Sequence, residues 1–98
     1  MQLRGYVLAP KATIENKKPI LYMYREKPDN IYDTGWRFFS GYESDEYVND
    51  PENIGIYDIS TITDIYPNIS PYLSLPTDSF LERDNKDSDF HLIREKTD

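Results

Sequence analysis

Residues 33–47 read DTGWRFFSGYESDEY, and this stretch decides the centre of the predicted fold. It holds the only Trp of the chain, two of its four Phe and two of its nine Tyr. Trp36-Arg37-Phe38-Phe39-Ser40 is β-rich and is followed by Gly41, so we predict a strand over residues 36–40. Side chains alternate across a strand, which puts Trp36 and Phe38 together on one face, where they are expected to join the core.

A second strand is predicted just before this stretch. Residues 20–25 read ILYMYR, with apolar residues on both faces, which is typical of a strand in the middle of a sheet. A turn at Lys27–Asn30 and a short irregular link to Gly35 separate the two strands. We therefore expect residues 20–25 and 36–40 to pair as antiparallel neighbours.

The flanking segments predict the remaining elements. Gly5–Ala9 reads as a first strand that stops at Pro10, Asn16–Lys18 as a turn, and Ile54–Tyr57 as a short extended segment. Ile59, Ile62 and Tyr66 recur at helical spacing, with Asp58 or Ser60 as the cap and Pro67 as the stop. Pro71–Pro76 is expected to wrap the core with Tyr72, Leu73 and Leu75 inward. Ser79–Arg83 and Asp89–Ile93 predict a closing hairpin, and the tail, residues 94–98, is expected to be frayed.

Together these elements predict one small α+β domain over residues 1–98, with a mostly antiparallel sheet and one short helix. The chain has no Cys, which excludes disulfides, thiolate catalysis and Cys-ligated metal sites. The longest apolar run, Ile20–Tyr24, is far too short to span a membrane, and MQLRGYVLAP lacks the apolar core of a signal peptide. These features favour a soluble, cytoplasmic protein.

The charge of the chain is concentrated in one segment. The formal net charge is −7, and residues 26–58 alone contain nine acidic and two basic residues, so they account for all of it. The other 65 residues carry nine acids and nine bases. Nucleic-acid phosphates and anionic membranes both require a basic face, so these partners are disfavoured. The acidic third coincides with the aromatic stretch.

Residue types and spacing give little support for catalysis or metal binding. Loops starting at Asp45 or Asp84 fail the calcium-loop pattern, because Asp50 replaces the sixth-position Gly in one and Lys86 occupies a ligand position in the other. His91 is the single His, and zinc usually requires several nitrogen or sulfur ligands. A catalytic Ser would have only this one imidazole as its base, and no Gly-x-Ser-x-Gly motif occurs. A carboxylate pair for glycoside hydrolysis is expected by chance in so acidic a chain. We predict no enzyme, no cofactor and no metal.

A protein-binding surface fits the same residues better. Interfaces favour rigid aromatic rings, and surrounding acids speed the capture of a basic partner. The segment Tyr42–Asn53 is predicted to be an acidic loop that presents rings and carboxylates outward. The expected contact residues are Tyr42, Glu43, Asp45, Glu46, Tyr47, Asp50 and Glu52. Reversing the charges of Glu43, Asp45 and Glu46 should weaken binding without unfolding the protein.

Two other readings of the chain stay open. A regulatory or adaptor module would bind a basic partner of another kind. A small enzyme or ligand-binding protein would need a deep pocket that joins Arg25, Arg37 and paired carboxylates. Alternatively, Arg25 and Arg37 could form structural ion pairs with Asp33 or Glu26.

Specific strings of the chain resemble a known family. YMYREKPDN (Tyr22–Asn30), DTGWRFFSGYESDEY (Asp33–Tyr47) and DPENIGIYDI (Asp50–Ile59) resemble the bacterial DUF2185 family, also called Imm33-like immunity proteins. PYLSLP (Pro71–Pro76) and FLERD (Phe80–Asp84) are similar to its later blocks, and Thr34 stands where the family often has Ser. The resemblance implies a non-enzymatic protein that binds and neutralises a bacterial toxin, and it supplies no catalytic residues. A basic toxin would match the acidic surface.

Overall fold

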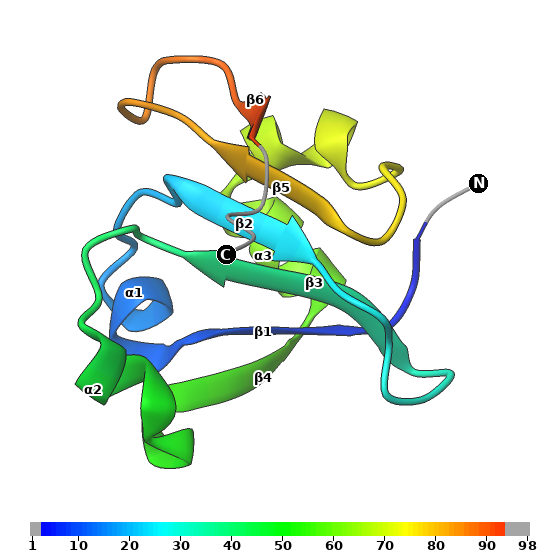
Figure 1. Ribbon diagram of the computed structural model, residues 1–98, viewed down its shortest axis with the longest axis horizontal. Helices are drawn as coiled ribbons and strands as arrows, with labels where there is room; N and C mark the ends of the chain where they lie inside the picture. The colour runs from blue at the N-terminus through cyan, green and yellow to red at the C-terminus, as the bar shows by residue number, and fades with distance from the viewer. Residues whose placement is uncertain (1–2, 94–98) are drawn as a thin grey trace.

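The computed structural model describes residues 3–93, which form one six-stranded sheet with short helices around it (Figure 1). The strand order is β4-β1-β3-β2-β5-β6. The strands are β1 (Tyr6–Pro10), β2 (Tyr22–Arg25), β3 (Asp33–Phe39), β4 (Ile54–Asp58), β5 (Ser79–Glu82) and β6 (His91–Ile93). The helices are α1 (Lys11–Glu15), α2 (Asp45–Asn49) and α3 (Ile59–Ile65), with 3-10 helices η1 (Pro51–Asn53) and η2 (Pro67–Tyr72). The α+β class is therefore confirmed.

The two strands predicted from the aromatic stretch and its neighbour are confirmed as the centre of the sheet. β2 and β3 pair antiparallel, with Met23 opposite Phe38 and Arg25 opposite Trp36. Trp36 and Phe38 are fully buried on the same face, and their rings stack with centroids 6.0 Å apart. β3 starts at Asp33 rather than Trp36, so the expected irregular link to Gly35 is shorter than predicted and covers only residues 31–32. Gly35 continues the strand at a φ of 86°, where a Cβ would lie 2.3 Å from the Glu26 carbonyl oxygen.

The sheet is mixed because β1 pairs parallel to β3 while the other pairs are antiparallel. Tyr6 lies opposite Asp33 and Leu8 opposite Arg37, with an irregular step between them. The chain passes from β1 through α1 and β2 before it returns as β3 beside β1 (Figure 1). A parallel neighbour requires such a crossover, and the polar segment from Lys11 onward supplies it.

The prediction of a single helix is wrong, although the predicted helix itself is confirmed. α3 begins after Asp58, whose carboxylate accepts the Ser60 N–H at 2.9 Å, and it ends before Pro67. The five-residue helices α1 and α2 are too short to show a clear apolar period. The residues predicted as a turn, Asn16–Lys18, close α1, with Lys17 at a φ of 51°.

The core lies between one face of the sheet and the layer made by α3 and η2, which lies behind the sheet in Figure 1. The sheet contributes Val7, Ala9, Met23, Trp36, Phe38 and Leu81, and the covering layer contributes Ile59, Ile62, Ile69 and Leu73. Tyr72 and Leu75 pack against this core, as expected for the wrapping segment. The Trp36 indole N–H donates to the Leu73 carbonyl at 3.2 Å and thereby ties the two layers together.

The opposite face of the sheet carries a ladder of half-buried rings. Tyr24 stacks on Phe39 and on Phe80, with centroids 5.9 and 5.5 Å apart, and Tyr22 lies beside Tyr24 at 5.8 Å. These rings come from three adjacent strands, so cross-strand contacts add to the stability of the sheet centre. The predicted closing hairpin is confirmed, because β5 and β6 pair antiparallel with Phe80 opposite Ile93. The tail, residues 94–98, lies outside the described residues.

Candidate binding surface

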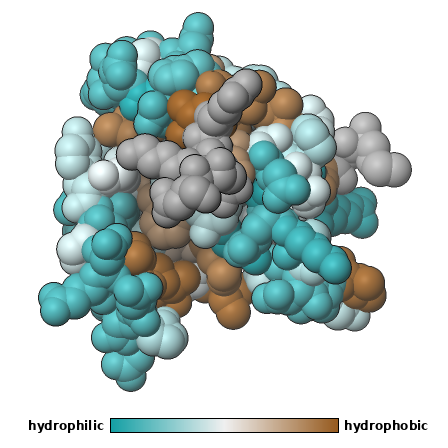
Figure 2. Space-filling view, in the orientation of Figure 1, coloured by the Kyte–Doolittle hydropathy of each residue, from teal (hydrophilic) through white to brown (hydrophobic). Residues whose placement is uncertain are grey.

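The predicted acidic loop is largely helical. Ser44 caps α2 by accepting the Tyr47 N–H at 3.1 Å, and Asp50 caps η1 by accepting the Glu52 N–H at 3.0 Å. The Asn53 side chain donates to the Tyr47 carbonyl at 3.0 Å and holds the two helical turns together. Hydrophilic side chains cover this corner of the molecule, below and to the left of the sheet (Figure 2). The acids therefore sit on a locally ordered support.

Glu43 differs from the other predicted contact residues because its carboxylate points inward. Its Oε2 accepts hydrogen bonds from the Thr13 hydroxyl at 2.9 Å, the Ser40 N–H at 2.9 Å and the Ser40 hydroxyl at 2.8 Å. Its Oε1 accepts the Gly41 N–H at 3.0 Å. Burial raises the pKa of Glu43, but the donors from Ser40 and Thr13 outweigh burial and leave the pKa below its ordinary value. Glu43 thus fixes the turn between β3 and α2 to α1.

Replacing Glu43 with alanine should lower the free energy of unfolding by about 2–3 kcal/mol, because it leaves several donors without their charged acceptor. Urea unfolding of Glu43→Ala measures this loss. Glu46→Ala is the control: Glu46 is exposed one residue into α2, and its loss should cost less than about 1 kcal/mol. Equal stability of the two variants would show that Glu43 is no anchor. Because of these contacts, a charge reversal at Glu43 would not leave folding intact.

Tyr42 and Tyr47 have different environments. Tyr42 is 83% exposed, directly before the anchored Glu43, so its ring is held out on a fixed turn. Tyr47 is half-buried and lies near Tyr57 on β4. Burial raises the pKa of Tyr57, and the neighbouring Glu15 and Tyr47 raise it further. Tyr42 is the ring that a partner reaches most easily.

Four exposed carboxylates complete the surface. We define the acidic surface as Tyr42, Asp45, Glu46, Asp50 and Glu52, all of which are exposed. None of these four acids forms an ion pair with any residue of the described range 3–93. Within the acidic third, Arg37 is buried in another ion pair, and only Lys27 remains as an exposed base. The structure thus presents these acids on α2, on η1 and at the junction between them, without an ion pair in the described range.

Arg37 is a structural residue, as one of the alternatives predicted. Its guanidinium donates to both oxygens of Asp33, at 2.9 and 2.8 Å, and to Glu26 at 2.6 Å. Burial lowers the pKa of Arg37, but its hydrogen bonds to Asp33 and Glu26 hold the pKa above its ordinary value. The same bonds from Arg37, against the opposing effect of burial, hold the pKa of Asp33 well below its usual range. Asp33 also accepts the N–H groups of Asp29 and Gly35, so the pair fixes the β2–β3 turn.

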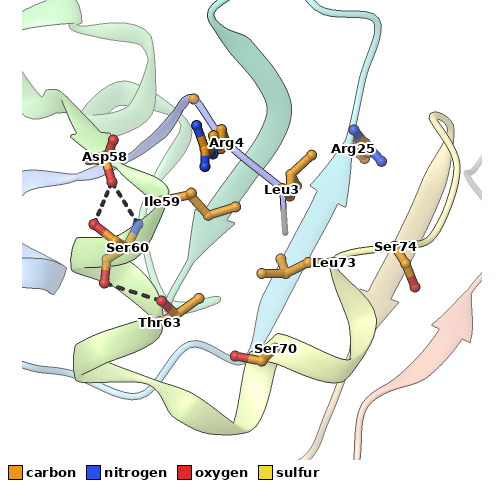
Figure 3. A pocket seen from close by; sticks show the side chains of 11 residues that line it. Leu3, Arg4, Arg25, Asp58, Ile59, Ser60, Thr63, Ser70, Leu73 and Ser74 are labelled. Carbon is orange, nitrogen blue, oxygen red and sulfur yellow. Dashed lines mark hydrogen bonds between the residues drawn. The ribbon is translucent and has the colours of Figure 1, made fainter. Parts of the chain in front are cut away.

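A groove of about 800 Å³ lies at a different place, between the start of the chain, α3 and η2 (Figure 3). Leu3, Ile59 and Leu73 give it apolar walls. Three of its polar residues bond to one another: Ser60 donates to Asp58, and Thr63 donates to the Ser60 carbonyl at 3.2 Å.

Arg25 borders this groove and Arg37 does not. The Arg25 guanidinium donates to the carbonyls of Thr34 at 2.9 Å and Leu75 at 2.8 Å. Arg37 pairs with Asp33 and Glu26 elsewhere. The ligand-binding alternative requires a pocket with both arginines and paired carboxylates, and none of the four grooves described within residues 3–93 is lined by Arg37.

Sequence reasoning missed an exposed hydrophobic residue beside the acidic surface. Ile56 is 70% exposed at the centre of β4, the strand that directly follows η1 in the chain. The alternation in Ile54-Gly55-Ile56-Tyr57 signals a strand with two different faces, but not that the strand lies at the edge of the sheet. Ile31 and Tyr32 are also exposed, in the β2–β3 turn, and no pattern in the sequence marks them.

No group of three or more His, Cys, Asp or Glu side chains in residues 3–93 is arranged to hold a metal ion. In the same range, no helix has the length and apolar character needed to cross a bilayer.

Comparison with known proteins identifies one family. The model of the Immunity protein Imm33 domain matches residues 7–94, which is nearly the whole chain. No curated protein and no solved structure matches. The match includes the β2–β3 core, the Arg37 ion pair and the acidic surface on α2 and η1. The chain therefore belongs to the Imm33 immunity protein domain family.

Proposed function

We propose that this protein neutralises a bacterial toxin by binding it directly, without catalysis, and that the acidic surface is the main contact. Membership of an immunity protein family supports a toxin as the partner. The observation that carries the finer proposal is the set of four exposed carboxylates on α2 and η1, with no ion pair inside the described chain. Such a set attracts a basic partner and repels acidic proteins.

The arrangement of Tyr42 supports the same contact. Its ring is 83% exposed, and the hydrogen bonds of Glu43 to Ser40 and Gly41 fix the turn on which it stands. A rigid exposed Tyr loses little conformational freedom on binding, which is the property of an interface anchor. The carboxylates of α2 and η1 would surround this ring as a charged rim.

The chemistry of the partner follows from this surface. A basic protein whose own active site carries cations, as in a phosphate-binding site, would find its charges matched by the acidic surface. Binding there would block access of substrate to the toxin. Attraction between exposed charges is screened by salt, so the complex should form more slowly and bind more weakly as ionic strength rises.

The test begins with capture from the host, using tagged protein and washes at low and then high salt. Each captured basic protein is then expressed alone and together with this protein. We expect one protein that is released by salt, that stops growth when expressed alone, and that is harmless in the co-expressing strain. A partner that is harmless alone would favour the adaptor alternative, and a toxin that still kills during co-expression would contradict the proposal.

A further inference from the structure

Among the described residues 3–93, β4 is an edge strand with no other strand on its outer side. Within that range it pairs only with β1, in a continuous antiparallel register from Tyr6 opposite Asp58 to Pro10 opposite Ile54. In Figure 1 it forms the lower border of the sheet, with α2 and η1 at one of its ends. The strand therefore offers one side of its backbone to the surroundings.

Two hydrogen bonds define which backbone groups face outward. The Ile59 N–H donates to the Gly5 carbonyl at 2.9 Å, and the Tyr6 N–H donates away from β4, to the Tyr32 carbonyl at 2.8 Å. Backbone groups alternate in direction along a strand, so Val7 and Ala9 face Tyr57 and Gly55. The outward groups of β4 are then those of Ile54, Ile56 and Asp58. Pro10, which has no N–H, stands opposite Ile54, where no donor toward β4 is needed.

The outward groups form a short hydrogen-bonding row. The Ile54 N–H already donates to the Pro51 carbonyl at the end of η1. The Ile56 N–H and C=O, the Ile54 C=O and the Asp58 N–H remain, and no partner for them is found in the described range 3–93. This spacing, with donors and acceptors two residues apart, is the one that an added strand uses.

The middle of this edge lacks several of the features that usually prevent strand addition. β4 contains no Pro and no Lys, its pairing with β1 has no bulge, and its one charged residue, Asp58, stands at its end. Ile56, at its centre, is 70% exposed and stands opposite Leu8 on the open face. An unprotected regular edge with an exposed Ile is costly to keep unless a partner uses it.

We propose that the β4 edge accepts an extended segment of the toxin as a seventh strand. The inference rests on the proposed function and adds the mode of binding to it. The segment would place an apolar side chain beside Ile56 and Leu8, and basic side chains near Asp50 and Glu52 at one end and Asp58 at the other. A second copy of this chain fits poorly, because pairing two β4 edges antiparallel brings Asp58 of one toward Glu52 of the other.

The test uses the purified toxin identified by the protection experiment, with Ile56→Pro and Ile56→Thr. Proline removes the outward N–H without removing a bond to β1, whereas threonine keeps the N–H and the β-branched shape. We expect Ile56→Pro to weaken binding about a hundredfold and Ile56→Thr less than about tenfold. An Ile56→Pro variant that has the wild-type circular dichroism spectrum and binds within about threefold of wild type would overturn the inference.

A measurement on the unmodified protein decides the matter if Ile56→Pro fails to fold. Amide hydrogen exchange at Ile56 and Asp58 should slow about a hundredfold when the toxin is saturating, because both N–H groups become bonded. Unchanged exchange in the saturated complex would overturn the inference, as would equal slowing when the protein alone is concentrated. If acidic-surface variants lose binding while edge variants keep it, the edge inference fails and the proposed function stands. If neither kind of variant loses binding, the edge inference fails and so does the proposal that the acidic surface is the contact.

Discussion

Replacing Arg37 with alanine is expected to lower the free energy of unfolding by about 3–5 kcal/mol, which is a large share of the stability of a domain this small. The change removes the partner of Asp33, whose side chain is almost completely buried, and it leaves that carboxylate charged inside the protein. It also removes the bond to Glu26, which joins the end of β2 to β3. Urea unfolding at pH 7 measures the loss.

The pH dependence of this loss identifies its cause. Asp33 has a folded-state pKa below its unfolded value, so its stabilising contribution is present above pH 4 and fades as the pH falls further. In Arg37→Ala, protonation of Asp33 relieves the buried charge instead. The gap in stability between wild type and variant should therefore narrow between about pH 7 and pH 3. A loss below about 1 kcal/mol, or a gap that is constant with pH, would show that the pair is not what holds the turn.

Replacing Trp36 with alanine is expected to cost about 3–5 kcal/mol as well, for a different reason. Trp36 has no exposed surface, and its removal leaves a cavity between the sheet and η2. The change also leaves the Leu73 carbonyl without its donor and removes the ring that stacks on Phe38 and lies 5.8 Å from the Arg25 guanidinium. Chemical denaturation gives the magnitude.

Tyr42→Ala provides the comparison for Trp36→Ala, because it removes another large ring of the same stretch, one that is 83% exposed. Its loss should change the free energy of unfolding by no more than about 0.5 kcal/mol. Similar costs for the two variants would mean that the division of this stretch into a buried strand and an exposed turn is incorrect.

The sequence was enough to predict those strands and helices that are specified by the spacing of neighbouring residues. The alternating rings of β2 and β3 indicated both strands and their antiparallel pairing, and the spacing of Ile59, Ile62 and Tyr66 indicated α3. The parallel pairing of β1 with β3 was missed, because it joins segments separated by α1 and β2. Nothing in either segment specifies its neighbour.

The binding surface also combines features that the sequence could predict with features that depend on the whole fold. Composition located the acidic third, and the structure leaves seven of its nine carboxylates exposed, four of them in the acidic surface. Composition could not show that the Glu43 carboxylate turns inward, because one of its hydrogen-bond donors is Thr13, thirty residues earlier in the chain. The position of β4 at the edge of the sheet likewise depends on the strand order, which is a property of the whole chain. That the exposed carboxylates contact a toxin stays a proposal.

The most direct test of the central claim compares two charge-reversal variants for affinity to the toxin. Glu46→Lys with Glu52→Lys changes the acidic surface, and Asp64→Lys with Asp89→Lys changes exposed acids elsewhere. Both variants change the formal net charge from −7 to −3. The comparison therefore separates the effect of where the charge lies from the effect of how much charge there is. We predict that the first variant raises the dissociation constant about thirtyfold and that its binding loses most of the dependence on salt. The dissociation constant of the second variant should stay within about threefold of the wild-type value. Equal affinities for the two variants would contradict the claim that the acidic surface is the contact.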